Sequence, residues 1–74
     1  MMYLGMKFKN YEELKEWNKK GHISYYKNLV VLFHSNPTME ASDLMDKEAA
    51  TLHDLFDMDW DVIDELEIST LKTL

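Results

Sequence analysis

Apolar residues alternate with other types at the start of the chain. Large apolar side chains occupy every second position from Met2 to Phe8, and Tyr3, Gly5 and Lys7 stand between them. A period of two is typical of a strand that buries one face and exposes the other. The pattern therefore predicts a strand at the N-terminus.

The spacing becomes helical after Asn10. Its side chain can cap a helix by accepting a hydrogen bond from the backbone N–H three residues on, and Glu13 can complete this capping box. Gly21 suits the position just beyond the C-terminal end of a helix. We therefore predict a helix over residues 11–20, whose apolar positions are Tyr11, Leu14 and Trp17.

The run Leu29–Phe33 is apolar at every position and lies between Asn28 and the pair Asn36 and Pro37. Such a run is typical of a strand covered on both faces, as in a parallel sheet. A strand is preferred, because the N-terminal strand needs a partner and so short a run is unusual for a buried helix. The rival interpretation, a buried helix from Ser24, stays open; its apolar face would carry Ile23, Tyr26, Val30 and Phe33.

A long second helix is predicted after Pro37, which sits at or just before the helix start, with Asn36 or Thr38 as the cap. Apolar residues then recur at helical spacing. They are Ala41, Leu44, Met45, Ala49, Leu52 and Phe56.

The acidic segment 57–59 interrupts that spacing. Beyond it a short acidic helix is predicted to begin near Asp59 or Asp61, with Val62, Ile63 and Leu66 as its apolar positions. The last residues, from Ile68 onward, would fray or form a short extended segment.

This order of elements resembles the N-terminal part of a thioredoxin-like domain. The matching features are the first strand, a helix containing Tyr11–Leu14, the apolar strand Leu29–Phe33, and a proline-containing turn into a long helix. In that family the strand leads into a Cys-x-x-Cys motif at a helix start. Here Thr38 and Ala41 stand at the cysteine positions of the window 33–41.

Two later segments also resemble that family. Residues 57–59 resemble the end of its third strand, and residues 68–73 resemble the segment before its cis-proline, with Lys72 in the place of the proline. The resemblance implies an α/β architecture without redox activity, because both cysteines are absent. It carries over no functional residue.

We therefore expect a single small domain over residues 1–74, of the α/β class, with α+β as the second choice. It would hold a small sheet of two to four strands, two main helices and a short C-terminal acidic helix. The alternative is a mostly α-helical bundle. A chain this small buries only about 60% of its unfolded surface, and Leu29–Phe33 would form an open sheet edge, so we expect a homodimer that covers this edge.

The composition excludes several classes of protein. The chain has no cysteine, which excludes disulfides and thiol chemistry. The N-terminal residues lack the pattern of a signal peptide, and no apolar run approaches the roughly 20 residues of a membrane span. We expect a soluble cytoplasmic protein that does not contact a membrane and needs no cofactor.

Charge is distributed unevenly. The net charge is −6, yet residues 1–38 are basic on balance and residues 39–74 are strongly acidic. Direct binding of nucleic acid needs clustered basic side chains, and the chain contains no arginine. We expect no direct nucleic-acid binding, and a partner protein with a basic surface matches the C-terminal half better.

No catalytic or metal site is predicted. Asp57, Asp59 and Asp61 begin like a calcium loop, but Val62 and Ile68 occupy the positions that need glycine and a bidentate glutamate. His22, His34 and His53 are too scattered to share a zinc ion, although His53 and Asp57 could face each other on one helix. The serines lack the context of a nucleophile, so we expect a protein that is not an enzyme.

These observations predict a non-catalytic interaction module, an adaptor or inhibitor, that binds its partner through the C-terminal acidic segment. One alternative is an acidic mimic of nucleic acid, of the kind that phages or mobile elements encode, which would inhibit a nucleic-acid-binding protein. Another is a redox-inactive thioredoxin-like remnant. The candidate partner-binding residues are Asp54, Asp57, Asp59, Trp60, Asp61, Asp64, Glu65 and Glu67.

Overall fold

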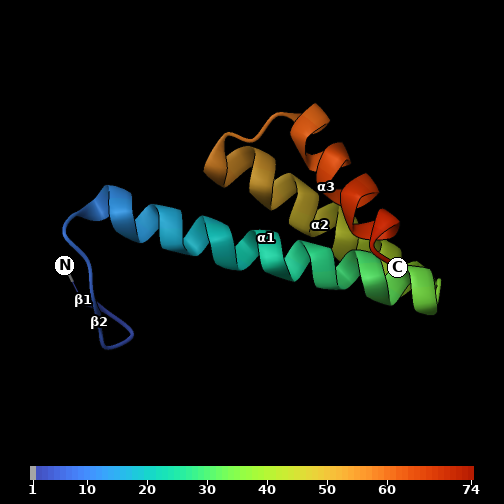
Figure 1. Ribbon diagram of the computed structural model, residues 1–74, viewed down its shortest axis with the longest axis horizontal. Coiled ribbons are helices and arrows are strands. Elements are labelled where there is room, and N and C mark those ends of the chain that lie inside the picture. The colour runs from blue at the N-terminus through green and yellow to red at the C-terminus, as the bar shows by residue number, and fades with distance from the viewer. Residues whose placement is uncertain (1) are drawn as a thin grey trace.

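Three helices follow a short N-terminal hairpin in the computed structural model, which describes residues 2–74 (Figure 1). The strands are β1 (Met2–Tyr3) and β2 (Met6–Lys7), and the helices are α1 (Tyr11–Ser35), α2 (Met39–Phe56) and α3 (Trp60–Lys72). Helices hold 77% of these described residues. The expected α/β class is therefore wrong, and the mostly α-helical alternative fits the chain better.

The largest correction concerns α1, which runs unbroken through Gly21 and through Leu29–Phe33. Nothing lies within 4 Å of a Cβ added at Gly21; glycine weakens a helix at such a position but need not end it. Leu29 and Val30 are buried, whereas Leu32 is 47% exposed. The run therefore buries one side, as a helix does, and not the two sides of an enclosed strand. Branched residues prefer strands, but tertiary packing outweighs this preference here and makes the run helical.

This correction removes the structural reason given for two expectations, which themselves stay predictions. The segment Leu29–Phe33 offers no sheet edge to a second copy, because its backbone groups are bonded within α1; the edge was the reason to expect a homodimer. The thioredoxin-like resemblance also depended on a strand at Leu29–Phe33, and this segment is helical.

The predicted N-terminal strand is a hairpin that pairs with itself. Met2 lies opposite Lys7 and Tyr3 opposite Met6 in an antiparallel pair. Its two turn residues are Leu4 and Gly5, with φ angles of 51° and 79°. Positive φ at both turn residues gives the twist that two-residue hairpins favour, so this short strand needs no distant partner.

Both N-caps predicted for the long helices are confirmed. The Asn10 side chain accepts from the backbone N–H of Glu13 at 3.0 Å, and the Thr38 hydroxyl accepts from that of Ala41 at 3.1 Å. Helix α3 begins directly after Asp59, as predicted, but it continues to Lys72. The fraying or extended segment expected from Ile68 onward is therefore wrong.

The main core lies where the C-terminal part of α1 meets α2 and α3. Helix α2 runs back along α1, and α3 follows it after a short turn (Figure 1). The side chains of Leu52, Ile63 and Val30 are the most completely enclosed. The residues of this core are Tyr26, Leu29, Val30, Met45, Leu52, Met58 and Ile63.

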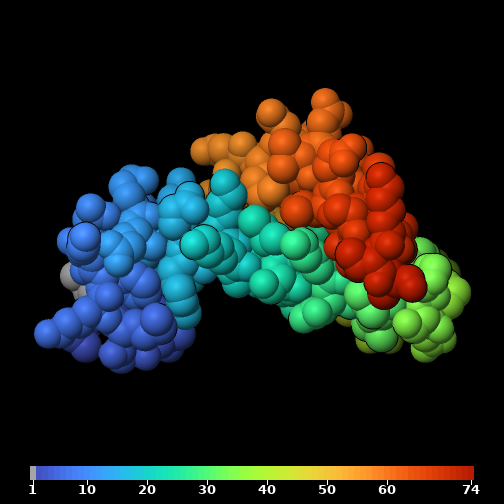
Figure 2. All heavy atoms as spheres, viewed as in Figure 1, coloured from blue at the N-terminus to red at the C-terminus, as the bar shows by residue number. Residues whose placement is uncertain are grey.

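The hairpin and the first part of α1 form an N-terminal arm, residues 2–20, that extends beyond α2 (Figures 1 and 2). Phe8 and Leu14 are buried there, outside the main core. The Trp17 ring lies 6.0 Å from that of Tyr3 and 5.7 Å from that of Phe8. The arm is therefore stabilised by a small aromatic cluster of its own.

His22, which follows the arm on α1, contacts α2. The His22 ring donates from Nδ1 to the Glu48 carboxylate at 2.7 Å and lies 5.2 Å from the Phe56 ring. Helix α1, about 37 Å long at 1.5 Å per residue, spans most of the 40 Å long axis of the molecule. Within residues 2–74, no helix is both long and apolar enough to cross a membrane.

Asp57 ends α2 in the left-handed region, with φ 53°, and its backbone N–H donates to the Leu52 carbonyl. Because this conformation costs a side chain with a Cβ about 1 kcal/mol, we expect Asp57→Gly to raise the free energy of unfolding by up to about 1 kcal/mol. Urea unfolding followed by circular dichroism measures this change. Asp59→Gly is the matched control, since Asp59 has an ordinary φ of −66° and glycine should destabilise the chain there. Stabilisation by both substitutions would point to charge, not backbone strain.

Candidate functional site: the acidic face

The predicted acidic segment covers the end of α2, the turn 57–59 and most of α3. We call the residues Asp54, Asp57, Asp59, Trp60, Asp61, Asp64, Glu65 and Glu67 the acidic face. All are exposed except Glu67, which is half-buried. Within residues 2–74 the sole ion pair joins His22 to Glu48, so no lysine of the described chain neutralises a carboxylate of this face.

Trp60, the first residue of α3, lies in the middle of the acidic face and is 50% exposed. One side of its indole stacks on the His53 ring, with centroids 4.3 Å apart and an interplanar angle of 18°. His53 in turn donates from Nδ1 to the Met58 carbonyl at 2.8 Å. Met58 is buried and Trp60 is half exposed. The turn therefore places the Met58 side chain in the core and the Trp60 ring at the surface.

His53, near the end of α2, does not pair with Asp57. A side-chain pair between His53 and Asp57 was one possible arrangement, but the ring bonds instead to the backbone of Met58, and Asp57 serves as the C-cap of α2. Among the described residues, no group of three or more His, Asp or Glu side chains could hold a metal ion.

A groove of about 310 Å³ is lined by residues of α1, α2 and α3. Tyr26 and Phe33 contribute aromatic rings from α1, and Trp60 contributes one from α3. Three carboxylates stand along the walls, and no lysine or histidine among the described residues lines it. These carboxylates belong to Asp46 on α2 and to Asp64 and Glu67 on α3.

Tyr26 occupies an unusual position in this groove. Only 3% of the residue is exposed, yet its hydroxyl makes no hydrogen bond within residues 2–74. Every fully enclosed side-chain nitrogen or oxygen in that range has a partner, so the hydroxyl oxygen is reached by solvent, and Tyr26 lines this groove. Burial, together with the nearby carboxylates of Glu67, Asp64 and Asp46, raises the pKa of Tyr26 to about 12. The phenol is therefore neutral at physiological pH and surrounded by negative charge.

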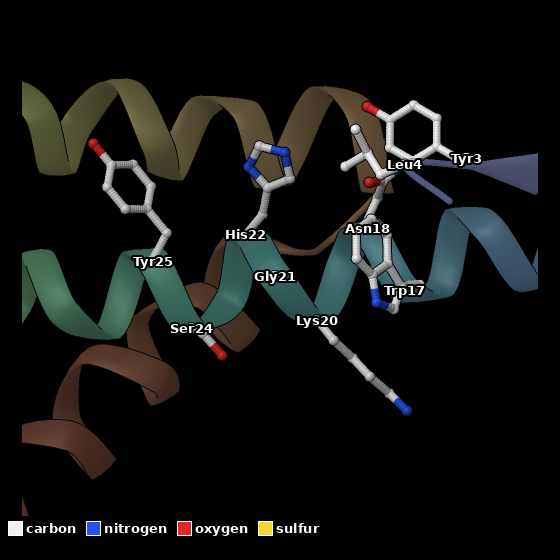
Figure 3. A pocket seen from close by; sticks show the side chains of 9 residues that line it. All are labelled: Tyr3, Leu4, Trp17, Asn18, Lys20, Gly21, His22, Ser24 and Tyr25. Atoms are coloured by element: carbon white, nitrogen blue, oxygen red, sulfur yellow. The ribbon is translucent and has the colours of Figure 1, made fainter. Parts of the chain in front are cut away.

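A second, larger hollow of about 490 Å³ lies beside the arm (Figure 3). Tyr3 and Leu4 of the hairpin border it at one end, near Trp17 and Asn18, and Tyr25 borders it farther along α1 (Figure 3). The hollow is open and mostly apolar. It contains no carboxylate within the described residues, so it lies apart from the acidic face both in position and in charge.

Sequence reasoning placed the acidic face on the surface but missed the groove. Asp46 and Tyr26 were not among the candidate residues, although Tyr26 belonged to the rival helical pattern. That pattern, continued through Val30 and Phe33, was the signal that could have put Tyr26 on an interior face. The chain as a whole matches no known family model, no curated protein and no solved structure.

Proposed function

We propose that this protein is a non-catalytic interaction module that binds a positively charged protein surface through the acidic face. One observation carries the proposal: a row of exposed carboxylates has no cationic partner in the described chain. Exposed charges of one sign favour a partner of the other sign and accelerate its association.

Trp60 supports the same proposal. Aromatic residues surrounded by polar or charged positions often supply much of the binding energy of an interface. The stack on His53 fixes the Trp60 ring before binding, so less conformational freedom is lost when a partner covers it. The carboxylates would then guide the partner, and the indole would hold it.

The proposal is tested by replacing three carboxylates of the acidic face, in the variant Asp57→Asn, Asp59→Asn and Asp61→Asn. Asparagine tolerates the left-handed conformation of residue 57, so the fold should persist. We expect basic proteins captured from a lysate at low salt by the wild type to be lost by this variant, and high salt to release them from the wild type.

The matched control removes the same charge from a different part of the chain. It carries Glu12→Gln, Glu13→Gln and Glu16→Gln, at the start of α1, and should capture as the wild type does. Equal loss in both variants would show a general charge effect and contradict the proposal, as would unchanged capture by the first variant. If added DNA releases the captured proteins, the partner is a nucleic-acid-binding protein and the carboxylates act in place of phosphates.

A further inference from the structure

The groove between α2 and α3 has two features that together indicate which class of ligand it could bind. Its three carboxylates lack a cation within the described chain, and the Tyr26 hydroxyl has no partner although the residue is almost fully buried. The hydroxyl oxygen is not fully enclosed, so a donor entering the groove can reach it. Negative charge and an unused hydroxyl thus meet at one place, which is suited to a cation that donates hydrogen bonds.

The spacing of these groups favours an organic cation over a metal ion. No set of three or more acidic or histidine side chains within residues 2–74 could hold a metal, so the carboxylates are too spread for one small ion. Asp46 stands on α2, whereas Asp64 and Glu67 stand on α3. A planar guanidinium group carries five donors spread in one plane, whereas an ammonium group is a compact charge.

The aromatic lining favours the same ligand. The Trp60 indole lines the groove and stays half exposed, and guanidinium groups stack well on indole rings. Resting on the proposed function, we propose that this groove binds the side chain of an arginine from the partner. The hydroxyl of Tyr26 accepts one of its hydrogen bonds, and the remaining donors bond to carboxylates of Asp46, Asp64 and Glu67.

A second copy of the chain cannot supply this ligand, because the sequence contains no arginine. The arginine therefore comes from a different protein. Tyr26 acts here as a neutral acceptor, since its phenol keeps its proton. Its hydrogen can point to a neighbouring carboxylate while its oxygen accepts from the guanidinium.

The test uses blocked arginine, N-acetyl-arginine-N-methylamide, titrated into the full chain and followed by NMR. We expect saturable shifts of the Trp60 indole N–H and of the backbone amides of Asp64 and Glu67. Blocked citrulline, which has the same shape without charge, should leave them unchanged. Blocked lysine should bind at least several-fold more weakly; equal affinity for lysine and arginine would overturn the guanidinium assignment.

Two variants distinguish arginine binding in the groove from non-specific attraction by the negative charge of the protein. Tyr26→Phe removes only the hydroxyl and should weaken arginine binding about tenfold while leaving the melting temperature unchanged or raised. The variant Asp46→Asn, Asp64→Asn and Glu67→Gln should show no saturable shift. The control Asp54→Asn, Asp61→Asn and Glu65→Gln loses the same charge outside the groove lining and should keep its affinity within about twofold.

These results are distinguishable from those for the proposed function. If the control loses binding as completely as the groove variant, or if the shifts centre on the turn 57–59, the arginine site is wrong. The capture experiment can still succeed in that case, since its variant changes no groove residue. If capture fails while blocked arginine binds as expected, the groove stands as an arginine site and the broader acidic face does not.

Discussion

Leu52→Ala is expected to lower the free energy of unfolding by about 3 kcal/mol. The Leu52 side chain is 0% exposed, and it belongs to the core shared by the three helices. Alanine would lose the burial of the removed carbons and leave a cavity, because a packed helical core closes such a space only in part. A small domain has only about 5–15 kcal/mol of stability in total, so this loss is a large fraction of it.

Urea unfolding and thermal melting followed by circular dichroism measure the effect, and the melting temperature should fall by about 15 °C. Leu55→Ala is the control on the same helix. The Leu55 side chain is 60% exposed, so its removal should change the stability by less than about 0.5 kcal/mol. Similar losses in the two variants would contradict the core as described.

Gly21→Pro is expected to separate the N-terminal arm from the rest of the molecule. Proline at this position removes an α1 hydrogen bond and clashes with the carbonyl one turn earlier, at a cost of about 3 kcal/mol. The arm contacts its own cluster around Trp17, whereas the main core begins beyond Gly21. Amide hydrogen exchange of residues 11–20 should therefore become about a hundredfold faster, while exchange at Leu52 changes little.

Gly21→Ala provides the opposite control. A Cβ at this position meets nothing within 4 Å, and alanine favours a helix over glycine by about 1 kcal/mol. Exchange in residues 11–20 should slow about fivefold. If Gly21→Pro instead destabilises Leu52 and the arm equally, the chain unfolds as one unit and the arm is not a separate packing unit.

The helix starts could be predicted from the sequence, because each depends on a few neighbouring residues. The caps at Asn10 and Thr38 are local hydrogen bonds that the sequence displays directly. The structure of Leu29–Phe33 could not be predicted in this way. A short apolar run suits an enclosed strand or a helix equally well until its packing partners are known, and here α2 and α3 cover only one side of it.

The structure at Gly21 could not be predicted from neighbouring residues either. Glycine just after a helical pattern is the usual sign of a helix end, yet the helical face resumes with Ile23 and Tyr26 in the next turn. Burial of that face outweighs the cost of about 1 kcal/mol that glycine imposes in a helix. The helical pattern that began at Ser24 and the pattern ending at residue 20 belong to one helix, α1.

The acidic face was accessible to sequence reasoning because its residues are close together along the chain. The groove was not, because its lining comes from three helices. Tyr26 and Asp46 are separated along the chain and meet Glu67 only through packing. No spacing rule within one element could have linked a phenol on α1 to carboxylates on α2 and α3.

The arm also gives the molecule an electric dipole. The arm, at one end of the 40 Å axis, carries five lysines against Glu12, Glu13 and Glu16, whereas carboxylates far outnumber lysines on α2 and α3. A dipole experiences a torque in the field of a charged surface, and this torque acts within about a Debye length, roughly 8 Å in physiological salt. Near a positive surface the molecule turns its carboxylates forward before contact. The hairpin tip at Leu4 then points away, toward solution.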